Sequence, residues 1–194
     1  FIDGTNTFVT TFSEYFFSDY KINSKTFPDL AVMQVSSNFT LEKPKISLPL
    51  LNSGIKAPEV ELFYADGNLF NLEKEKGKVI LLNFTVNGCP HCVEAIETLN
   101  RLFAKHKSED FQIVSINAYD TKESILKFNN RFNVKYPAFI KSEKTNKTLE
   151  DYHVDSYPTF YLIDKQGNIA RTFSGYYPTL EAEINSTIDN INDL

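Results

Sequence analysis

The feature that most constrains this chain is a Cys-x-x-Cys motif that closely follows an apolar run. Residues 78–86 are mostly apolar and have the length of a strand that is buried on both faces of a sheet. The motif Cys89-Pro90-His91-Cys92 comes next, and after it apolar residues recur at helical spacing with charged residues between them: Val93, Ile96, Leu99 and Phe103. The sequence therefore predicts a buried strand, a short loop and an amphipathic helix whose first turn carries both cysteines.

The remainder of the chain continues this alternation of strands and helices. Further strands are predicted at residues 59–64, 111–117, 138–141, 159–164 and 168–174, and further helices at 122–132, in the segment leading to Tyr152, and at 180–191. The turn Lys165-Gln166-Gly167 joins the last two strands as a hairpin. Strands that alternate with helices build a parallel sheet, and a hairpin adds antiparallel strands to it. We therefore predict an α/β fold with a mixed central sheet and helices on both faces.

The composition is that of a soluble globular protein. The 194 residues, 42% hydrophobic and 23% charged, suffice for one domain with a full core and an appendage. No stretch approaches the roughly 18 apolar residues that a membrane-spanning helix needs. The formal net charge is −5, and lysine and arginine form no cluster, which argues against a nucleic-acid partner.

Residues 1–53 differ from the rest and are predicted to be a small N-terminal extension, with the main domain at residues 54–194. Aromatic residues at helical spacing predict an amphipathic helix in this extension: Phe8, Phe12, Tyr15, Phe16 and Tyr20. Pro44 and Pro49 then indicate an extended connector. The sequence starts with Phe1 in place of Met, so we expect either a processed product or a truncated chain, in which any signal peptide or lipid anchor is already absent.

The two cysteines are the only ones in the chain, and their close spacing indicates a chemical and not a scaffolding role. A helix start favours a thiolate, because unpaired backbone N–H groups and the positive end of the helix dipole lie there. Cys89 is therefore the predicted nucleophile. Cys92, one turn further on, can attack a mixed disulfide formed at Cys89 and is the predicted resolving thiol. Pro90 is tolerated in the first turn, where its missing N–H would have no partner.

His91 lies between the two cysteines and is the predicted tuning residue. Its imidazole can donate a hydrogen bond or, when protonated, offer a positive charge to the Cys89 sulfur. Stabilising the thiolate stabilises the reduced pair, which raises its reduction potential. The alternative interpretation is that His91 is an exposed spacer.

Five segments, taken in order, carry a family resemblance. They are Gly54-Ile55-Lys56-Ala57-Pro58, Gly77-Lys78-Val79-Ile80-Leu81-Leu82-Asn83-Phe84, the cysteine motif, Ser156-Tyr157-Pro158-Thr159 and Asp164-Lys165-Gln166-Gly167. Together they are similar to the TlpA/ResA-type thioredoxin-like proteins over residues 54–194, without the extension. The resemblance implies a thioredoxin-like fold and a thiol-disulfide oxidoreductase that exchanges its Cys89–Cys92 disulfide with protein substrates and with a redox partner protein.

The resemblance also implies where the substrate binds and where the protein acts. Tyr157-Pro158 is expected to be a cis peptide that faces the cysteines and exposes backbone to the substrate. The expected catalytic group is Cys89, Cys92, His91 and Pro158, and the expected substrate contacts are Pro90, Tyr157 and Thr159. Beyond the redox-active disulfide we expect no cofactor and no metal. The expected location is the bacterial periplasm or cell envelope, with a membrane tether upstream of residue 1.

Several positions depart from the thioredoxin pattern. Asn83, six residues before the motif, stands where thioredoxin has a buried acid, and Asn is frequent there in TlpA/ResA relatives. Ala95 stands where those relatives commonly have Glu, and Thr85 and Gly88 stand where they have Trp. The dipeptide Pro90-His91 is the one found in DsbA-like oxidants, so we expect a reduction potential between those of thioredoxin and DsbA.

Two other functions stay open at this point. A peroxiredoxin also uses a cysteine at a helix start, but it has Thr or Ser three residues before that cysteine, where this chain has Val86. A copper or zinc chaperone could use the cysteines and the histidine of the motif as ligands. The sequence places neither His106 nor His153 near the motif, however, and a Cys-x-x-Cys pair at a helix start commonly forms a disulfide.

Overall fold

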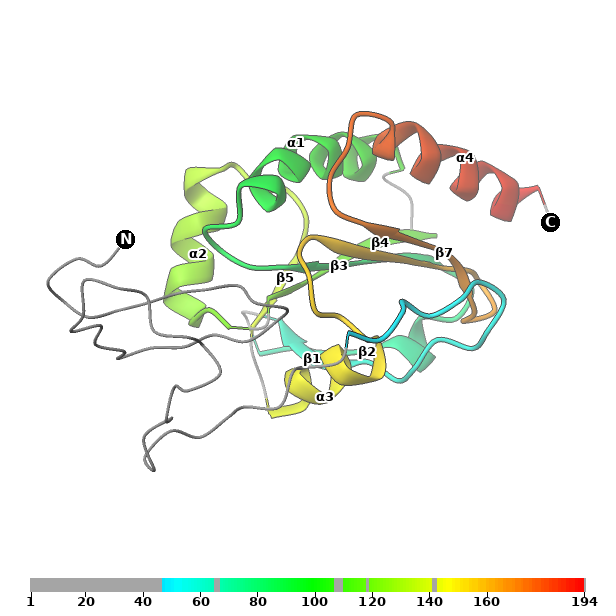
Figure 1. Cartoon of the computed structure of the whole chain (residues 1–194), viewed down its shortest axis with the longest axis horizontal. Helices are drawn as coiled ribbons and strands as arrows, with labels where there is room; N and C mark the ends of the chain where they lie inside the picture. Colours follow the sequence, from blue (N-terminus) through cyan, green and yellow to red (C-terminus); the bar gives the residue numbers. More distant parts are fainter. Residues whose placement is uncertain (1–46, 65–66, 107–109, 118, 141–142, 194) are drawn as a thin grey trace, which may run out of the picture. The chain divides into compact units, whose positions relative to one another are not determined.

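The computed structural model (Figure 1) describes residues 47–64, 67–106, 110–117, 119–140 and 143–193. The helix predicted within residues 1–46 therefore lies outside the described residues. One compact unit is formed by Leu48–Leu194. Its first residues join the domain, because the Leu51 N–H donates to the Tyr161 hydroxyl at 3.2 Å. The existence of a separate extension before this unit stays a prediction.

A seven-stranded sheet is the centre of the described residues. Its strands are β1 (Glu61–Tyr64), β2 (Leu69–Asn71), β3 (Val79–Thr85), β4 (Phe111–Asn117), β5 (Ala138–Ile140), β6 (Thr159–Ile163) and β7 (Ile169–Ser174). Their order in the sheet is β2-β1-β5-β4-β3-β6-β7. The neighbours β3, β4 and β5 are parallel, whereas β6 and β7 at one side and β1 and β2 at the other are antiparallel to their neighbours. The prediction of a mixed sheet is confirmed.

Helices cover both faces of this sheet, as predicted. In Figure 1, α1 (Pro90–Lys105) and α4 (Leu180–Asn192) lie on one face and α3 (Glu143–Asp151) lies on the other, while α2 (Lys122–Arg131) packs against β5. A short 3-10 helix, η2 (Leu72–Glu75), leads toward β3. β2 and η2 were not predicted, because three or four residues are too few to show a period. No helix in the described ranges is long and apolar enough to cross a membrane.

Two apolar cores, one on each face of the sheet, fix the position of β3. Its side chains alternate, so that Val79 and Leu81 join one core and Ile80 and Leu82 join the other. The helices supply the remaining walls: Ala95, Leu99 and Leu102 of α1, Leu180, Ile184 and Ile188 of α4, and Leu149 of α3. Because α1 follows β3 directly, the loop between them starts from a strand that is held from both sides.

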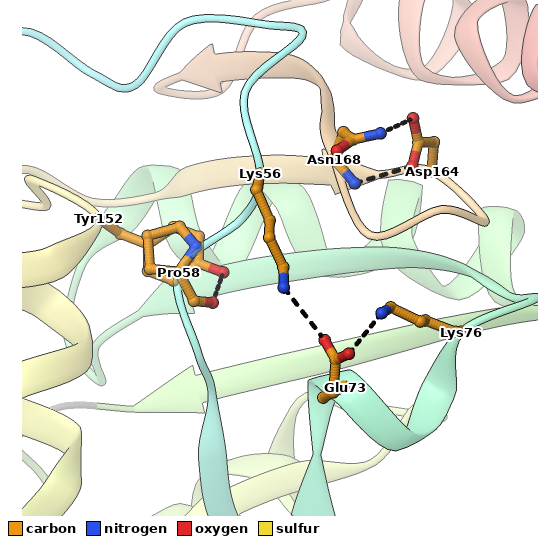
Figure 2. Close-up of polar contacts among 7 residues, drawn as sticks. All are labelled: Lys56, Pro58, Glu73, Lys76, Tyr152, Asp164 and Asn168. Atoms are coloured by element: carbon orange, nitrogen blue, oxygen red, sulfur yellow. Dashed lines mark hydrogen bonds and ion pairs between the residues drawn. The ribbon is translucent and has the colours of Figure 1, made fainter.

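The segment before β1 is anchored to the domain by polar contacts (Figure 2). The Tyr152 hydroxyl donates to the Pro58 carbonyl oxygen at 2.8 Å. Lys56 Nζ lies 3.7 Å from a Glu73 carboxylate oxygen, and Lys76 pairs with the same carboxylate. These contacts bind the start of the domain to η2 and to the turn after α3.

The predicted hairpin between β6 and β7 closes around an aspartate. Asp164 Oδ1 accepts the N–H groups of Gln166 at 2.9 Å and of Asn168 at 2.8 Å, and Figure 2 shows the Asn168 contacts. Gly167 has a φ of +88°, a left-handed conformation that only glycine adopts without strain. The turn residues of the sequence therefore form the turn that was predicted for them.

Candidate active site

The loop from β3 to α1 places the motif just beyond the carboxyl end of β3, a strand in the interior of the sheet. β3 ends at Thr85, and Gly88 turns the chain with a φ of +80°. Cys89 is extended, with φ −80° and ψ 116°, and caps the helix that begins at Pro90. A proline at the first helical position loses no hydrogen bond, because the N–H there has no helical partner.

The two cysteines lie in contrasting environments. Cys92 is 3% exposed, whereas Cys89 is half-buried, and both are free thiols. The Cys92 N–H donates to the Cys89 sulfur at 3.2 Å, so the helix start directs a donor at that sulfur. Burial raises the pKa of the Cys92 thiol to about 12, and hydrogen bonding to Cys89 shifts this pKa in the same direction. Cys92 therefore keeps its proton at neutral pH, and Cys89 is the sulfur that a partner can reach.

The loop that precedes β6 lies against Cys89. The Tyr157–Pro158 peptide is cis, and the Cys89 thiol donates to the Tyr157 carbonyl oxygen with a sulfur–oxygen distance of 3.6 Å. Thr159 follows as the first residue of β6, where its side chain is fully buried and its hydroxyl donates to the Ser156 carbonyl at 2.8 Å. Its side chain thus faces the interior, and its contact with substrate stays a prediction.

His91 pairs with a carboxylate one helical turn further on. Its Nδ1 lies 2.9 Å from Glu94 Oε2, and both side chains are more than half exposed. The spacing of three residues brings them to the same face of α1. The tuning of Cys89 by His91 stays a prediction, and the structure adds Glu94 as a carboxylate that holds the imidazole. The i, i+3 spacing of the two residues is the sequence signal from which this pair could be predicted.

These features can be compared with known proteins. The model of the family described as Redoxin matches residues 52–188. The chain belongs to the Redoxin family. The thiol-disulfide oxidoreductase ResA of Geobacillus kaustophilus is 29% identical over 141 residues, which cover 73% of this chain and 77% of that protein. The protein of the same name from Bacillus anthracis is 29% identical over 137 residues, which cover 71% of this chain and 75% of that protein.

Solved structures share the architecture of this Redoxin-family chain. A protein from Chlorobium tepidum, assigned as a thiol:disulfide interchange protein DsbE, has a TM-score of 0.66 and 26% identity, covering 73% of this chain and 98% of that one. A thiol:disulfide interchange protein from Bacteroides sp. has a TM-score of 0.63 and 22% identity, and the match covers 73% of this chain and 91% of that one. The fold is thioredoxin-like, as the resemblance implied.

A polar network holds the loop before the motif in this Redoxin-family chain. The Asn87 N–H donates to Asp120 Oδ2 at 2.9 Å, and the Asn87 side-chain amide donates to Ser124 Oγ at 2.9 Å. Asn117 Nδ2 donates to Asp120 at 2.8 Å, while Asn117 Oδ1 accepts the N–H groups of Tyr119 at 3.1 Å and Asp120 at 3.0 Å. The network joins the β3–α1 loop to the β4–α2 loop. Sequence reasoning missed the bonds that join the two loops, because those from Asn87 to Asp120 and to Ser124 span 33 and 37 positions.

Asn83 lies inside the sheet at the position of the thioredoxin acid. It is 3% exposed, and its Nδ2 donates to Ser115 Oγ on β4 at 3.1 Å. An amide cannot take up or release a proton as a carboxylate does. Proton transfer to Cys92 through an acid at this position is therefore not available to this chain.

The other two histidines make structural contacts. His106 Nε2 lies 2.6 Å from Asn185 Oδ1, and its ring packs on Phe111 with centroids 5.3 Å apart. His153 Nδ1 donates to the Pro49 carbonyl oxygen at 2.8 Å. In the part of the chain that the structure describes, no three His, Cys, Asp or Glu side chains are grouped so that they could hold a metal ion.

Proposed function

We propose that this chain exchanges disulfides with protein substrates through Cys89 as the attacking sulfur and Cys92 as the resolving one. The chain is a thiol-disulfide oxidoreductase of the thioredoxin type, as the Redoxin family and the ResA relatives support. The observation that carries the assignment of roles is the contrast in burial between two thiols on one helical turn. The reachable sulfur also receives the Cys92 N–H.

The exchange proceeds in two steps. The Cys89 thiolate attacks one sulfur of a substrate disulfide, so that a Cys89–substrate bond forms, the substrate S–S bond breaks and one substrate thiolate leaves. Cys92 then gives up its proton and attacks Cys89, forming the Cys89–Cys92 disulfide and releasing the second substrate thiolate. The substrate gains two electrons and the chain loses two. The reverse sequence oxidises a substrate dithiol, and the reduction potential decides which direction dominates.

The Tyr157–Pro158 loop is the proposed docking edge for the substrate backbone. Tyr157 presents its carbonyl oxygen to Cys89 at 3.6 Å, so a chain that pairs with this loop lies beside the attacking sulfur. Pro158 has no N–H to donate, and its carbonyl oxygen accepts the Gly175 N–H at 2.8 Å, which holds this end of the loop to the sheet. Pro90, the first residue of α1, follows Cys89 directly and is a further proposed substrate contact.

The location and the partners belong to the same proposal. The relatedness to ResA supports protein thiols and disulfides as substrates, together with a redox partner protein that restores the pair. The family resemblance favours the bacterial periplasm or cell envelope, with a membrane tether upstream of residue 1. Fractionation of cells that express the natural protein tests the location: recovery of the native protein from the cytoplasm alone would contradict it.

The function is tested with the full chain in reduced form. With dithiothreitol as the reductant that restores the pair, reduction of the disulfides of insulin is followed by the loss of soluble insulin, and one variant with both Cys89→Ser and Cys92→Ser serves as the inactive control. We expect turnover by the natural sequence and none by the double variant. Consumption of hydrogen peroxide without disulfide exchange would instead support the peroxidase alternative, and stoichiometric copper or zinc binding that blocks alkylation of both cysteines would support the metal-chaperone alternative.

A further inference from the structure

Tyr119 is an exposed aromatic residue next to the reactive loop. It is 61% exposed, more than any other large apolar side chain in the described ranges. Its ring meets the ring of Tyr157 edge to face, with centroids 6.0 Å apart. Tyr157 is the residue whose carbonyl oxygen accepts the Cys89 thiol. An aromatic surface thus stays open to solvent beside the attacking sulfur.

The backbone that carries Tyr119 is held in place. Its N–H donates to Asn117 Oδ1 at 3.1 Å, and the next residue, Asp120, accepts the N–H of Asn87 at 2.9 Å. Asn87 precedes Cys89 by two residues. The polar network therefore ties the backbone of Tyr119 to the loop of the nucleophile, and the contact with Tyr157 orients the ring. A ring that is positioned in advance loses little conformational entropy when a partner binds.

Exposure alone does not distinguish Tyr119 from other exposed apolar residues such as Leu126. Its contact with Tyr157, the residue that meets the Cys89 thiol, does. Tyr157 is itself half-buried, and the Tyr119 ring covers only part of it with an edge-to-face contact. The open face of Tyr119 is thus available to a molecule that binds at Cys89.

We propose that Tyr119 contacts the substrate and selects protein substrates that carry an aromatic or large aliphatic side chain next to the reactive cysteine. This inference rests on the disulfide exchange proposed above and names the substrate class. A substrate whose sulfur bonds to Cys89 brings the side chain of its neighbouring residue toward the Tyr119–Tyr157 pair. Contacts between aromatic rings correspond to about threefold to tenfold in affinity.

The test uses two peptides that contain the same disulfide and differ only in the residue before the reactive cysteine, Phe in one and Ser in the other. The full chain is assayed with both peptides in the presence of dithiothreitol, which restores the reduced pair after each exchange, and kcat and KM are determined separately after subtraction of the rate without protein. We expect the natural sequence to have a KM about threefold to tenfold lower for the Phe peptide, with similar kcat. Tyr119→Ala should remove this preference by raising the KM for the Phe peptide, and Tyr119→Phe should retain it.

Leu126→Ala is the matched control, because Leu126 is an exposed apolar residue of α2 at 44% exposure that makes no contact used in the proposal. It should keep the preference of the natural sequence. Circular dichroism verifies that each variant is folded. A natural sequence without preference between the peptides would overturn the proposal without any variant, and a folded Tyr119→Ala chain that keeps the preference would overturn it as well.

Bis(2-hydroxyethyl) disulfide separates failure of this inference from failure of the proposed function, because it is small and has no neighbouring side chain. A natural sequence that reduces neither this compound nor the peptides would contradict disulfide exchange itself, and the role of Tyr119 with it. A natural sequence that reduces the small compound and both peptides with equal KM would overturn only the role of Tyr119.

Discussion

At the scale of single residues, two cysteines of one motif differ because one is covered by the fold and the other caps a helix. Cys92 faces the interior and holds its proton to a pKa of about 12, mainly because burial disfavours its charged form. Cys89 is half-buried and receives the Cys92 N–H. In the proposed exchange, the buried thiol therefore reacts only after a mixed disulfide has formed at Cys89.

The raised pKa of Cys92 predicts how the stability of the reduced chain depends on pH. In the unfolded chain a cysteine loses its proton above about pH 8.5, whereas folded Cys92 keeps it up to about pH 12. The folded state then binds more protons, so the free energy of unfolding falls as pH rises, by about 2 kcal/mol at pH 10. Urea unfolding of the reduced chain at pH 8 and pH 10 measures this loss. The free energy of unfolding of Cys92→Ala should fall less between pH 8 and pH 10 than that of the natural sequence. An equal fall in both chains would show that Cys92 is not the source of the pH dependence.

Substitutions of His91 and of Glu94 should shift the reduction potential of the Cys89–Cys92 pair in opposite directions. His91→Ala removes a donor that can stabilise the Cys89 thiolate and should lower the potential by about 30–60 mV, the equivalent of one charge-assisted hydrogen bond. Glu94→Gln removes the carboxylate that holds the imidazole at 2.9 Å and should raise the potential. Equilibration with glutathione, followed by thiol alkylation, measures both. Unchanged potentials would leave His91 as a spacer.

At the scale of the elements, the strands and helices that could be predicted are those with a clear hydrophobic pattern in their own residues. β3 and α1 follow from the apolar run of residues 78–86 and from an apolar stripe at helical spacing, and Cys89 follows as the residue between them. The bonds from Asn87 to Asp120 and to Ser124 could not be predicted, because they depend on how two loops meet after the sheet has formed. The pairing of Tyr119 with Tyr157 was missed for the same reason.

Asp120 is the acceptor that connects Asn87 and Asn117 in the polar network. Its carboxylate accepts from the backbone of Asn87 and from the side chain of Asn117, so Asp120→Ala leaves both donors without this acceptor. We expect a loss of about 1–3 kcal/mol in the free energy of unfolding and a lower rate of alkylation at Cys89. Asp120→Asn is the matched control, since one oxygen remains to accept, and it should lose less. Equal values for the two variants would contradict this role.

At the scale of the whole molecule, the mixed sheet with a core on each face is what fixes the site. Leu99 lies on the inner side of α1, 1% exposed, in the core shared with α4. Leu99→Ala should lower the free energy of unfolding by about 2–5 kcal/mol through lost burial and a cavity. Leu126→Ala on the exposed face of α2 should change it by less than about 0.5 kcal/mol. Thermal and urea unfolding compare the two, and similar losses would contradict the assignment of this core.

The central claim is that Cys89 is the attacking sulfur and Cys92 the resolving one, and trapping of the mixed disulfide tests this most directly. Full chains with Cys92→Ser or Cys89→Ser are mixed in reduced form with a peptide disulfide and analysed by intact mass and peptide mapping. Cys92→Ser should accumulate a stable adduct at Cys89, because the nucleophile remains and nothing resolves the intermediate. Cys89→Ser should accumulate none, since Cys92 is buried and protonated. An adduct that forms at Cys92 in the Cys89→Ser chain, and none at Cys89, would reverse the assignment.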